Sequence, residues 1–345
     1  YARDFSLSFL LRPRVNDFYN VVERLPEIRL GVPRKELGDT NIFYQGDHTL
    51  SHLEMRWRDF DRSGGALLPQ DYDTWRADSL NMFYSPFYLL EKLQLTPRAG
   101  FRLTYYEDTS AASVSTADLL NNFELVDADR TNVSRLPNAV NYNDAGGNAL
   151  RYAGELGLRL DTKFFSLWDN IRKPSWDIDG LRLVTQPFVN YTYIPEPSED
   201  RQNLYFFDRT DRLIQQNFVR VGVRERLQSR RSSGEDIYTM AELQTYADFH
   251  LDPPRQEAHL GELVAELEAG PVSGWSVDAL VTADMDAKKF NRSDVTLRWK
   301  GPNRLGMALS YDYRREYARR ALFSMGSTLT DFTGVAELGV IAGGG

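Results

Sequence analysis

The chain has 345 residues and a formal net charge of −8, from 41 Lys and Arg against 49 Asp and Glu. Its hydrophobic content of 42% excludes an intrinsically disordered chain, and its acidic balance excludes a general nucleic-acid binder, which needs a basic face. The chain contains no cysteine, so disulfide scaffolds, thiolate metal sites and cysteine nucleophiles are excluded as well.

The aromatic content is high for a chain of such low hydropathy. Aromatic residues make up 12% of the sequence, and the mean hydropathy is −0.47. No apolar run approaches the roughly 20 residues that a membrane helix needs. A transmembrane β-barrel also has a low mean hydropathy, because lipid-facing and lumen-facing residues alternate along each strand. Low hydropathy therefore does not exclude a membrane protein of this kind.

Apolar and polar residues alternate with period two, the strand period, in many segments. In chain order these segments are residues 53–58, 101–105, 150–161, 237–251, 275–286 and 305–314. In the first, Leu53, Met55 and Trp57 alternate with charged residues. Sliding such a strand by one residue would place charges in lipid, so the register is strongly specified. We therefore expect the apolar rows to face lipid.

The segment from Ile237 to Leu251 is the longest clean example. Its odd positions are mostly apolar and its even positions, among them Glu242, are mostly polar. A strand of a soluble protein has about 5–6 residues, whereas a tilted membrane strand needs about 9–11. The length of this segment favours a membrane barrel over a soluble sandwich.

The connections between these segments differ in length. Long polar stretches cover residues 59–73, 107–147 and 195–212, and tight hairpins are predicted at 269–271 and 300–303. The stretch 116–126 has a weak helical pattern. The spacing indicates about 14–16 strands of membrane length. We expect an all-β, antiparallel transmembrane β-barrel of the outer-membrane type, complete or partial, with residues 1–345 as a single domain or a fragment of one.

The sequence offers little chemistry for catalysis or metal binding. His48 and His52 have the i, i+4 spacing of a helical metal site, but they fall in a strand-like segment and no Glu follows His48. His250 is the one histidine whose strand parity would suit a membrane-embedded hydrolase, and a plain polar lumen residue is the more common interpretation. We predict no catalytic residue, no metal site and no cofactor.

One cluster of arginines is a candidate binding surface. Arg220, Arg224 and Arg226 lie on one face of a predicted strand. Arginine prefers planar pairing with carboxylate or phosphate. Two interpretations stay open, with the first favoured: a structural ladder with Glu242, Glu262 or Glu266, or a path for an anionic lipid headgroup.

Prolines lie within or beside several strand-like runs, at positions 13, 26, 33, 86, 97 and 187. A proline removes a donor from the hydrogen-bond ladder and weakens strand pairing. Weak pairing would suit a barrel that opens sideways, and proline is also an ordinary residue at the start of a strand. Both interpretations have equal weight.

Three consecutive runs of the sequence resemble one family. Residues 181–195 form a proline-containing strand that ends in Tyr-x-Tyr-x-Pro, residues 203–212 hold a Phe-Asp followed by an Asp-Arg, and residues 217–231 resemble the next strand. Together with the runs at 25–30 and 95–106, in this order, they resemble LptD, the lipopolysaccharide-assembly protein of the outer membrane. The resemblance spans about residues 20–320.

This resemblance implies lipopolysaccharide transport and insertion into the outer leaflet through a barrel that opens sideways. It also implies two protein partners, an LptE-like plug lipoprotein and an LptA-like periplasmic bridge protein. The chain departs from the family in lacking the N-terminal jelly roll and its cysteines, and in having too few residues for the full set of strands. The alternatives are a general or substrate-specific porin, an outer-membrane lipid hydrolase, and a soluble carbohydrate-binding β protein.

Overall fold

The computed structural model describes most of the strand-forming sequence. The described residues are 5–16, 21–57, 71–89, 92–111, 143–144, 146–211, 213–231, 236–252, 260–272, 274–285, 288–300, 305–314 and 335–342. The segment 116–126, for which a weak helical pattern was noted, and the predicted turn at 301–303 lie outside these residues.

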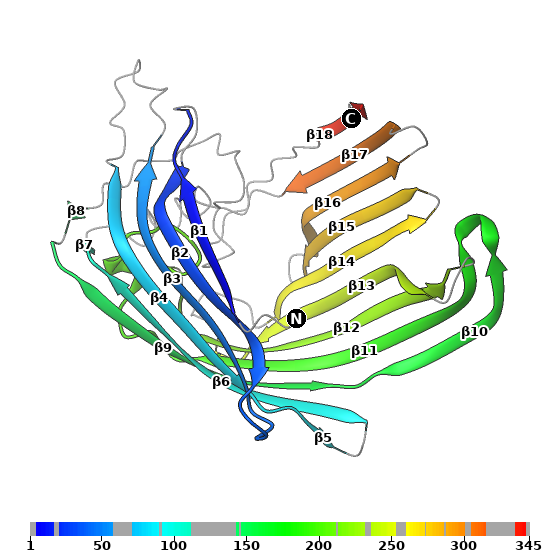
Figure 1. Ribbon diagram of the computed structural model, residues 1–345, viewed down its shortest axis with the longest axis horizontal. Coiled ribbons are helices and arrows are strands. Elements are labelled where there is room, and N and C mark those ends of the chain that lie inside the picture. The colour runs from blue at the N-terminus through cyan, green and yellow to red at the C-terminus, as the bar shows by residue number, and fades with distance from the viewer. Residues whose placement is uncertain are drawn as a thin grey trace. The chain divides into compact units, whose positions relative to one another are not determined.

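The described chain is made almost entirely of β-strands (Figure 1). The strands are β1 (Ser6–Arg12), β2 (Val21–Glu36), β3 (Phe43–Arg56), β4 (Tyr72–Tyr84), β5 (Phe87–Leu89), β6 (Leu93–Tyr106), β7 (Ser110–Ala111), β8 (Asn143–Asp144), β9 (Ala149–Asp161), β10 (Phe164–Lys173), β11 (Ile178–Ile194), β12 (Gln216–Arg230), β13 (Ile237–His250), β14 (Leu260–Val272), β15 (Trp275–Asp284), β16 (Lys289–Lys300), β17 (Leu305–Arg314) and β18 (Val335–Ala342). Two short 3₁₀ turns, η2 (Pro174–Trp176) and η3 (Arg201–Asn203), complete the described elements.

The strands pair in the order in which they follow along the chain. They form a 16-stranded sheet with the order β1-β2-β3-β4-β6-β9-β11-β12-β13-β14-β15-β16-β17-β18, in which β5 pairs with β6 and β10 pairs with β11, and β7 and β8 form a separate pair. The registers are antiparallel, for example Arg220 opposite Asp248. The expected all-β antiparallel fold is confirmed, and the sheet reaches the upper end of the predicted strand number. Within the described ranges, no helix has the length and apolar character to cross a bilayer.

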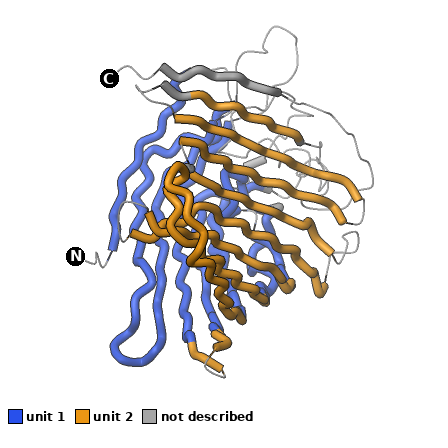
Figure 2. The backbone as a smooth tube through the Cα atoms, turned by 90° about the vertical axis from the view of Figure 1, so that its right-hand side faces the viewer, with its two compact units in different colours: residues 1–86, 96–158, 192–217 blue, residues 87–95, 159–191, 218–345 orange. Residues whose placement is uncertain are grey.

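The chain divides into two compact units, which Figure 2 colours separately. Unit 1 comprises residues 1–86, 96–158 and 192–217, and unit 2 comprises residues 87–95, 159–191 and 218–345. Unit 1 thus holds β1 to β4 with most of β6 and β9, and unit 2 holds most of β11 and β12 and all of β13 to β18. The prediction that residues 1–345 are a single barrel domain, or a fragment of one, stays a prediction.

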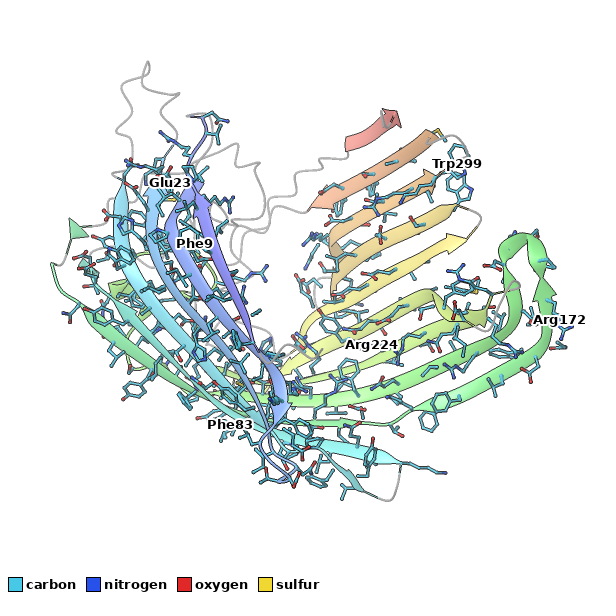
Figure 3. All side chains as sticks on the ribbon, viewed as in Figure 1. Phe9, Glu23, Phe83, Arg172, Arg224 and Trp299 are labelled. Atoms are coloured by element: carbon cyan, nitrogen blue, oxygen red, sulfur yellow. The ribbon has the colours of Figure 1, made fainter. Side chains whose placement is uncertain are left out.

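Strand β9 in unit 1 shows how the alternating sequence becomes two different faces. Leu150, Tyr152 and Leu156 are each more than half exposed, whereas the intervening Arg151 and Ala153 are buried. Phe101, Leu103 and Tyr105 on β6 are likewise exposed. Large apolar side chains that stand in rows on one face are the arrangement that a lipid-facing surface requires. Figure 3 shows side chains on both faces of the strands.

Strand β3 reverses the expected orientation near its end. Leu53, Met55 and Trp57 are buried, at 0%, 1% and 4% exposure, while the charged Glu54 and Arg56 between them point to the other side. The expectation that this apolar row faces lipid is wrong. These three residues share one face of the sheet with the buried Arg76 and Tyr72 of β4. A buried loop, described below, packs on this face. Alternation alone gives the two faces of a strand but not which of them meets lipid.

The hairpin predicted at 269–271 is also corrected. Strand β14 continues to Val272, which pairs with Trp275, so the chain reverses at 273–274. The register of β14 and β15 shifts between Ala269 and Val272, and Gly270 has a φ of +106°. Glycine tolerates this conformation while other residues rarely do. The Gly-Pro pair therefore marks an irregularity in the ladder two residues before the turn.

Long and short connections alternate along the sheet from β2 to β13, whereas the three consecutive connections 273–274, 285–288 and 301–304 are all short. The connections 37–42, 85–92, 174–177, 231–236, 273–274 and 301–304 are short, and those at 57–71, 107–148, 195–215 and 315–334 are long. Outer-membrane barrels have short turns on the periplasmic side and longer loops on the extracellular side. The alternation agrees with the prediction from the polar stretches of the sequence.

Two prolines coincide with irregular pairing of β2. The register of β2 and β3 shifts between Arg24 and Glu27 and again between Val32 and Lys35. Pro26 lies in the first of these intervals and Pro33 in the second. A residue without an N–H cannot donate to the ladder, so the pairing is interrupted where the sequence places proline.

Candidate functional site

The arginines singled out in the sequence lie on one face of unit 2. In the register of β12 and β13, Arg220 is opposite Asp248, Arg224 is opposite Gln244, and Arg226 is opposite Glu242. Because residues two apart point to the same side of a strand, the three arginines and their partners share one polar face. The even positions of β14, among them Glu262 and Glu266, continue this face.

Two of the three arginines are engaged by their cross-strand neighbours. Arg220 donates to both carboxylate oxygens of Asp248, at 2.7 and 2.8 Å. Arg224 donates from Nε to the side-chain oxygen of Gln244 at 2.8 Å and lies 3.3 Å from a carboxylate oxygen of Glu242. Arg220 also lies over the ring of Tyr246, 4.1 Å from its centroid. Such bidentate pairs fix the side chains in place.

Of the three glutamates expected to pair with these arginines, only Glu242 forms an ion pair with one of them among the described residues. Glu242 pairs with Arg224, whereas Glu262 accepts a hydrogen bond from Asn291 and Glu266 accepts one from Tyr246. The Nε of Arg226 is buried without a hydrogen-bond partner. The face therefore contains the structural ladder predicted from the sequence, with Asp248 as the partner that the sequence did not single out. The role of Arg220, Arg224, Arg226 and Glu242 in carrying a headgroup stays a prediction.

The histidines are held by separate neighbours on strands. His48 Nδ1 is 2.9 Å from the hydroxyl of Ser79, and His52 Nε2 is 3.1 Å from a carboxylate oxygen of Asp73. Both histidines lie in β3, as the strand pattern predicted, and not on a helix. His250 ends β13, where its ring lies 6.0 Å from that of Phe218. Among the described residues, no group of three or more His, Asp and Glu could hold a metal ion.

A second candidate site lies in unit 1 and is built by a loop. We call residues 201–211, between β11 and β12, the inner loop. Its apolar residues Leu204, Tyr205, Phe206 and Phe207 are all buried. The ring of Tyr205 stacks on that of Tyr72 with centroids 4.9 Å apart, and the hydroxyl of Tyr72 donates to the carbonyl of Phe206 at 2.6 Å. Buried aromatic pairs of this kind add to the free energy of area burial.

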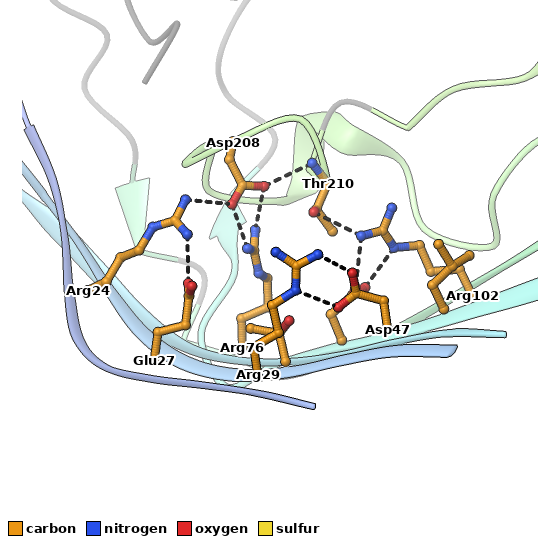
Figure 4. Close-up of a pocket in the computed structure, with 11 residues that line it drawn as sticks. Arg24, Glu27, Arg29, Asp47, Arg76, Arg102, Asp208 and Thr210 are labelled. Carbon is orange, nitrogen blue, oxygen red and sulfur yellow. Dashed lines mark hydrogen bonds and ion pairs between the residues drawn. The ribbon is translucent and has the colours of Figure 1, made fainter. Parts of the chain in front are cut away.

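Charged residues of the strands bind the inner loop through ion pairs and hydrogen bonds (Figure 4). Arg76 of β4 donates to Asp208 at 3.0 and 2.6 Å and to Asp211 at 2.8 Å. The side chain of Arg76 is 4% exposed and that of Asp211 is 1% exposed. We call Arg76, Asp208 and Asp211 the ionic latch. A buried charge is tolerated only when it is paired and hydrogen-bonded. Here each of the three charges has a partner of opposite charge, and the Nε of Arg76 is the one nitrogen of its guanidinium that is buried without a hydrogen-bond partner.

Asp211 also shapes the tip of the inner loop. One carboxylate oxygen accepts the backbone N–H groups of Phe207 and Asp208, at 2.9 and 3.0 Å. The other accepts the hydroxyl of Tyr106 at 2.8 Å. Arg151 of β9 donates to the carbonyl of Thr210 at 2.6 Å. Asp211 therefore binds backbone N–H groups of its own loop and side chains of two strands, and these contacts hold the loop in one conformation.

A cavity of about 180 Å³ lies beside the latch and is lined by charged residues in matched numbers. Arg24 bonds to Glu27 at 2.7 Å, Arg29 to Asp47, and Arg102 to Asp78 at 2.8 Å. Since each arginine already has a carboxylate, an anion entering this cavity would have to displace one. The arrangement is suited to holding the loop in place.

The pKa of Asp208 is lowered by its surroundings. Burial alone raises the pKa of this carboxyl, but the charge and hydrogen bonds of Arg76, the N–H of Thr210 and the charge of Arg24 outweigh burial. Asp208 is thus ionised in the folded protein over the whole physiological range of pH.

Only part of the inner loop is indicated by the sequence. Residues 195–212 were interpreted as a polar connection, because charged residues surround the run at 204–207. Four consecutive apolar residues, three of them aromatic, do not suit a solvated loop, and they are the signal that could have indicated a packed segment. The pairing of Arg76 with Asp208 and Asp211 joins residues more than 130 positions apart, and no local pattern reveals it.

The sequence of most of the strand region matches one protein family. The family is LptD, described as LPS transport system D, and the match covers residues 22–322. The chain belongs to the LptD family. Its place is the outer membrane, and its family is one of transport proteins and not of enzymes. The resemblance noted in the sequence is confirmed over nearly the range expected.

Comparison with individual proteins finds only distant similarities. No curated protein matches the sequence. Among solved structures, the chain is similar to the ferric enterobactin receptor PfeA of Pseudomonas aeruginosa, mutant R480A_Q482A, with 12% identity and a TM-score of 0.28 over 92% of this chain. It is similar to PfeA in complex with BCV-L6 with 11% identity and a TM-score of 0.29 over 90%. The match spans 44% of either receptor chain, less than half of its length. Superpositions this weak carry no conclusion.

Proposed function

We propose that this LptD-family chain transports lipopolysaccharide and inserts it into the outer leaflet of the outer membrane. The observation that carries the proposal is the two-faced strand within a transport family. Leu150, Tyr152 and Leu156 of β9 present an apolar surface, while Arg151 and Glu155 belong to the opposite, polar face. An amphipathic lipid needs an apolar route for its acyl chains and a polar route for its sugars and phosphates.

The proposed route of the headgroup follows the polar face of unit 2. Arg220, Arg224, Arg226 and Glu242 lie on it, and the buried Nε of Arg226 has no hydrogen-bond partner. The carboxylates that pair with Arg220 and Arg224 keep the face close to neutral. A phosphate that passes along such a face meets donors but no strong trap, because carboxylates compete for the same guanidinium groups.

The proposed exit for the acyl chains is a sideways opening of the sheet. The irregular pairing of β2 with β3 at Pro26 and Pro33 supports weak pairing near the first strands. The proposed partners are an LptE-like lipoprotein that plugs the barrel and an LptA-like periplasmic protein that delivers the lipid. The long connections, including the one that holds the inner loop, would then lie on the extracellular side.

The test is depletion of the full-length protein in its own cells, followed by replacement with variants. Depletion is expected to reduce lipopolysaccharide at the cell surface, measured by surface labelling of intact cells. Replacement with a triple variant, Arg220→Gln, Arg224→Gln and Arg226→Gln, should restore several-fold less surface lipopolysaccharide than the unaltered protein. Arg172→Gln, which removes an exposed arginine of β10 that pairs with Asp179 of β11 in the same unit, is the matched control and should restore it fully.

The outcomes separate the parts of the proposal. Unchanged surface lipopolysaccharide on depletion, together with loss of small-solute uptake, would favour a porin and overturn the transport proposal. Full restoration by the triple variant would remove these arginines from the route while leaving the transport function in place. Heat-modifiable gel mobility shows that each variant is folded.

A further inference from the structure

We propose that the inner loop is a fixed barrier on the lumen face of unit 1, and that Arg76 is the residue that positions it. The proposal concerns the passage of small polar solutes and does not require lipopolysaccharide as cargo. It rests on three features of the described residues: where the loop packs, how it is fastened, and how completely its charges are neutralised.

The inner loop packs on the face away from lipid. Strands β6 and β9 expose Phe101, Leu103, Leu150 and Tyr152 on one side. The loop contacts residues of opposite parity, such as Tyr106, Arg102 and Arg151. In an outer-membrane protein the exposed apolar side faces lipid, so the loop lies on the lumen side.

The apolar residues of the inner loop are as buried as those of a folded core. Leu204 and Phe207 are 1% and 0% exposed. The stacked Tyr72 and Tyr205 provide the apolar half of the attachment, and the ring of Phe207 meets that of Tyr72 edge-on at 5.2 Å. A segment with this burial opens rarely, since loops of low stability have few buried contacts.

The ionic latch makes the position of the inner loop specific. Arg76 reaches Asp208 with two nitrogens and Asp211 with one of them. In the sheet, Arg76 lies between Ser51 of β3 and Tyr106 of β6, so its backbone is fixed on both sides. Arg24 of β2 adds a second cation 3.6 Å from Asp208. Removing Arg76 would leave two carboxylates without their shared partner in a buried site, which disfavours the packed position of the loop.

The charges that line the cavity beside the inner loop are balanced, which supports a role for the loop as a barrier and not as a binding site. Each of Arg24, Arg29 and Arg102 already has a carboxylate partner. A closed set of ion pairs holds the segment against the wall and leaves little net charge to attract a solute. The loop therefore narrows the polar route beside it and takes no ligand of its own.

The test uses cysteine labelling, because the 345 residues contain no cysteine. Leu204→Cys places a single thiol in the buried part of the inner loop, and Leu37→Cys places one in the exposed turn between β2 and β3. A water-soluble maleimide should label Cys at position 204 of the folded protein at least about 100-fold more slowly than at position 37. Combining Leu204→Cys with Arg76→Met should raise its labelling rate at least about 10-fold, and combining it with Arg172→Gln should not.

The second readout is conductance of the purified full-length protein in planar bilayers of phosphatidylcholine in KCl. Arg76→Met should raise single-channel conductance at least about two-fold, and Arg76→Lys, which keeps the charge but loses the two-nitrogen contact, should give an intermediate value.

Equal labelling rates at position 204 with and without Arg76, measured in folded protein with heat-modifiable gel mobility, would overturn the role of the latch. Faster labelling without any rise in conductance would overturn the barrier. Loss of folding in Arg76→Met would move the test to Arg76→Lys, with the same two criteria.

Discussion

At the residue scale, the structure depends on charged side chains that are paired with partners of opposite charge. Arg76 pairs with Asp208 and Asp211 with little access to water, and the partly exposed Arg220 pairs with Asp248 through two nitrogens. Removing one member of such a group costs more than the group contributes, because the remaining charge is left buried and unpaired. Single substitutions in the latch should therefore have large effects.

The lowered pKa of Asp208 leads to a pH prediction. An unfolded aspartate has a pKa of about 3.9, and the folded value lies below it. The carboxylate therefore contributes stability that is fully present above about pH 5 and is lost as pH falls below about 4. The melting temperature of the wild type should exceed that of Asp208→Asn by a constant amount from pH 8 to pH 5, corresponding to about 2 kcal/mol.

The gap between the two melting curves should then shrink in stronger acid. Thermal unfolding monitored by gel mobility at a series of pH values measures it, and each variant is its own reference for general acid effects. A gap that grows as pH falls would mean that Asp208 is protonated in the folded protein, contrary to the geometry of the latch.

At the element scale, strand periodicity was readable from the sequence and strand orientation was not. The alternation in residues 150–161 predicted an apolar face that the structure exposes, and the alternation in 237–251 predicted β13 to within one residue. The same reasoning failed at Leu53, Met55 and Trp57, which are buried on the face of the sheet that carries the inner loop. Which face meets lipid is decided by tertiary contacts.

A charge on the exposed row of β9 tests the lipid-facing assignment. Leu156→Arg should lower the free energy of unfolding in lipid by about 2–4 kcal/mol if the position is near the middle of the membrane. Leu37→Arg, at an exposed residue of the turn after β2, should change it by less than about 0.5 kcal/mol. Urea unfolding in lipid vesicles provides both values, and equal effects of the two substitutions would argue against burial of β9 in lipid.

At the scale of the whole molecule, the family was accessible from sequence order, because the Pro-containing strand, the loop and the next strand follow one another at 181–231. The number of strands was accessible from the length of the chain and the spacing of strands of membrane length. The inner loop was not, since its attachment joins residues of β4, β6 and β9 to a segment after β11. Periodicity reports local structure, whereas the contents of a lumen depend on contacts between distant segments.

The central claim is that these two-faced strands cross the outer membrane with their apolar rows in lipid. The most direct test is a single-cysteine scan of β9, Ala149–Asp161, in protein reconstituted with lipids that carry a quencher on the acyl chain. Fluorophores at even positions, including those of Leu150, Tyr152, Leu156 and Leu158, should be quenched, and those at odd positions should not. Equal quenching at even and odd positions, or none at any position, would contradict the account.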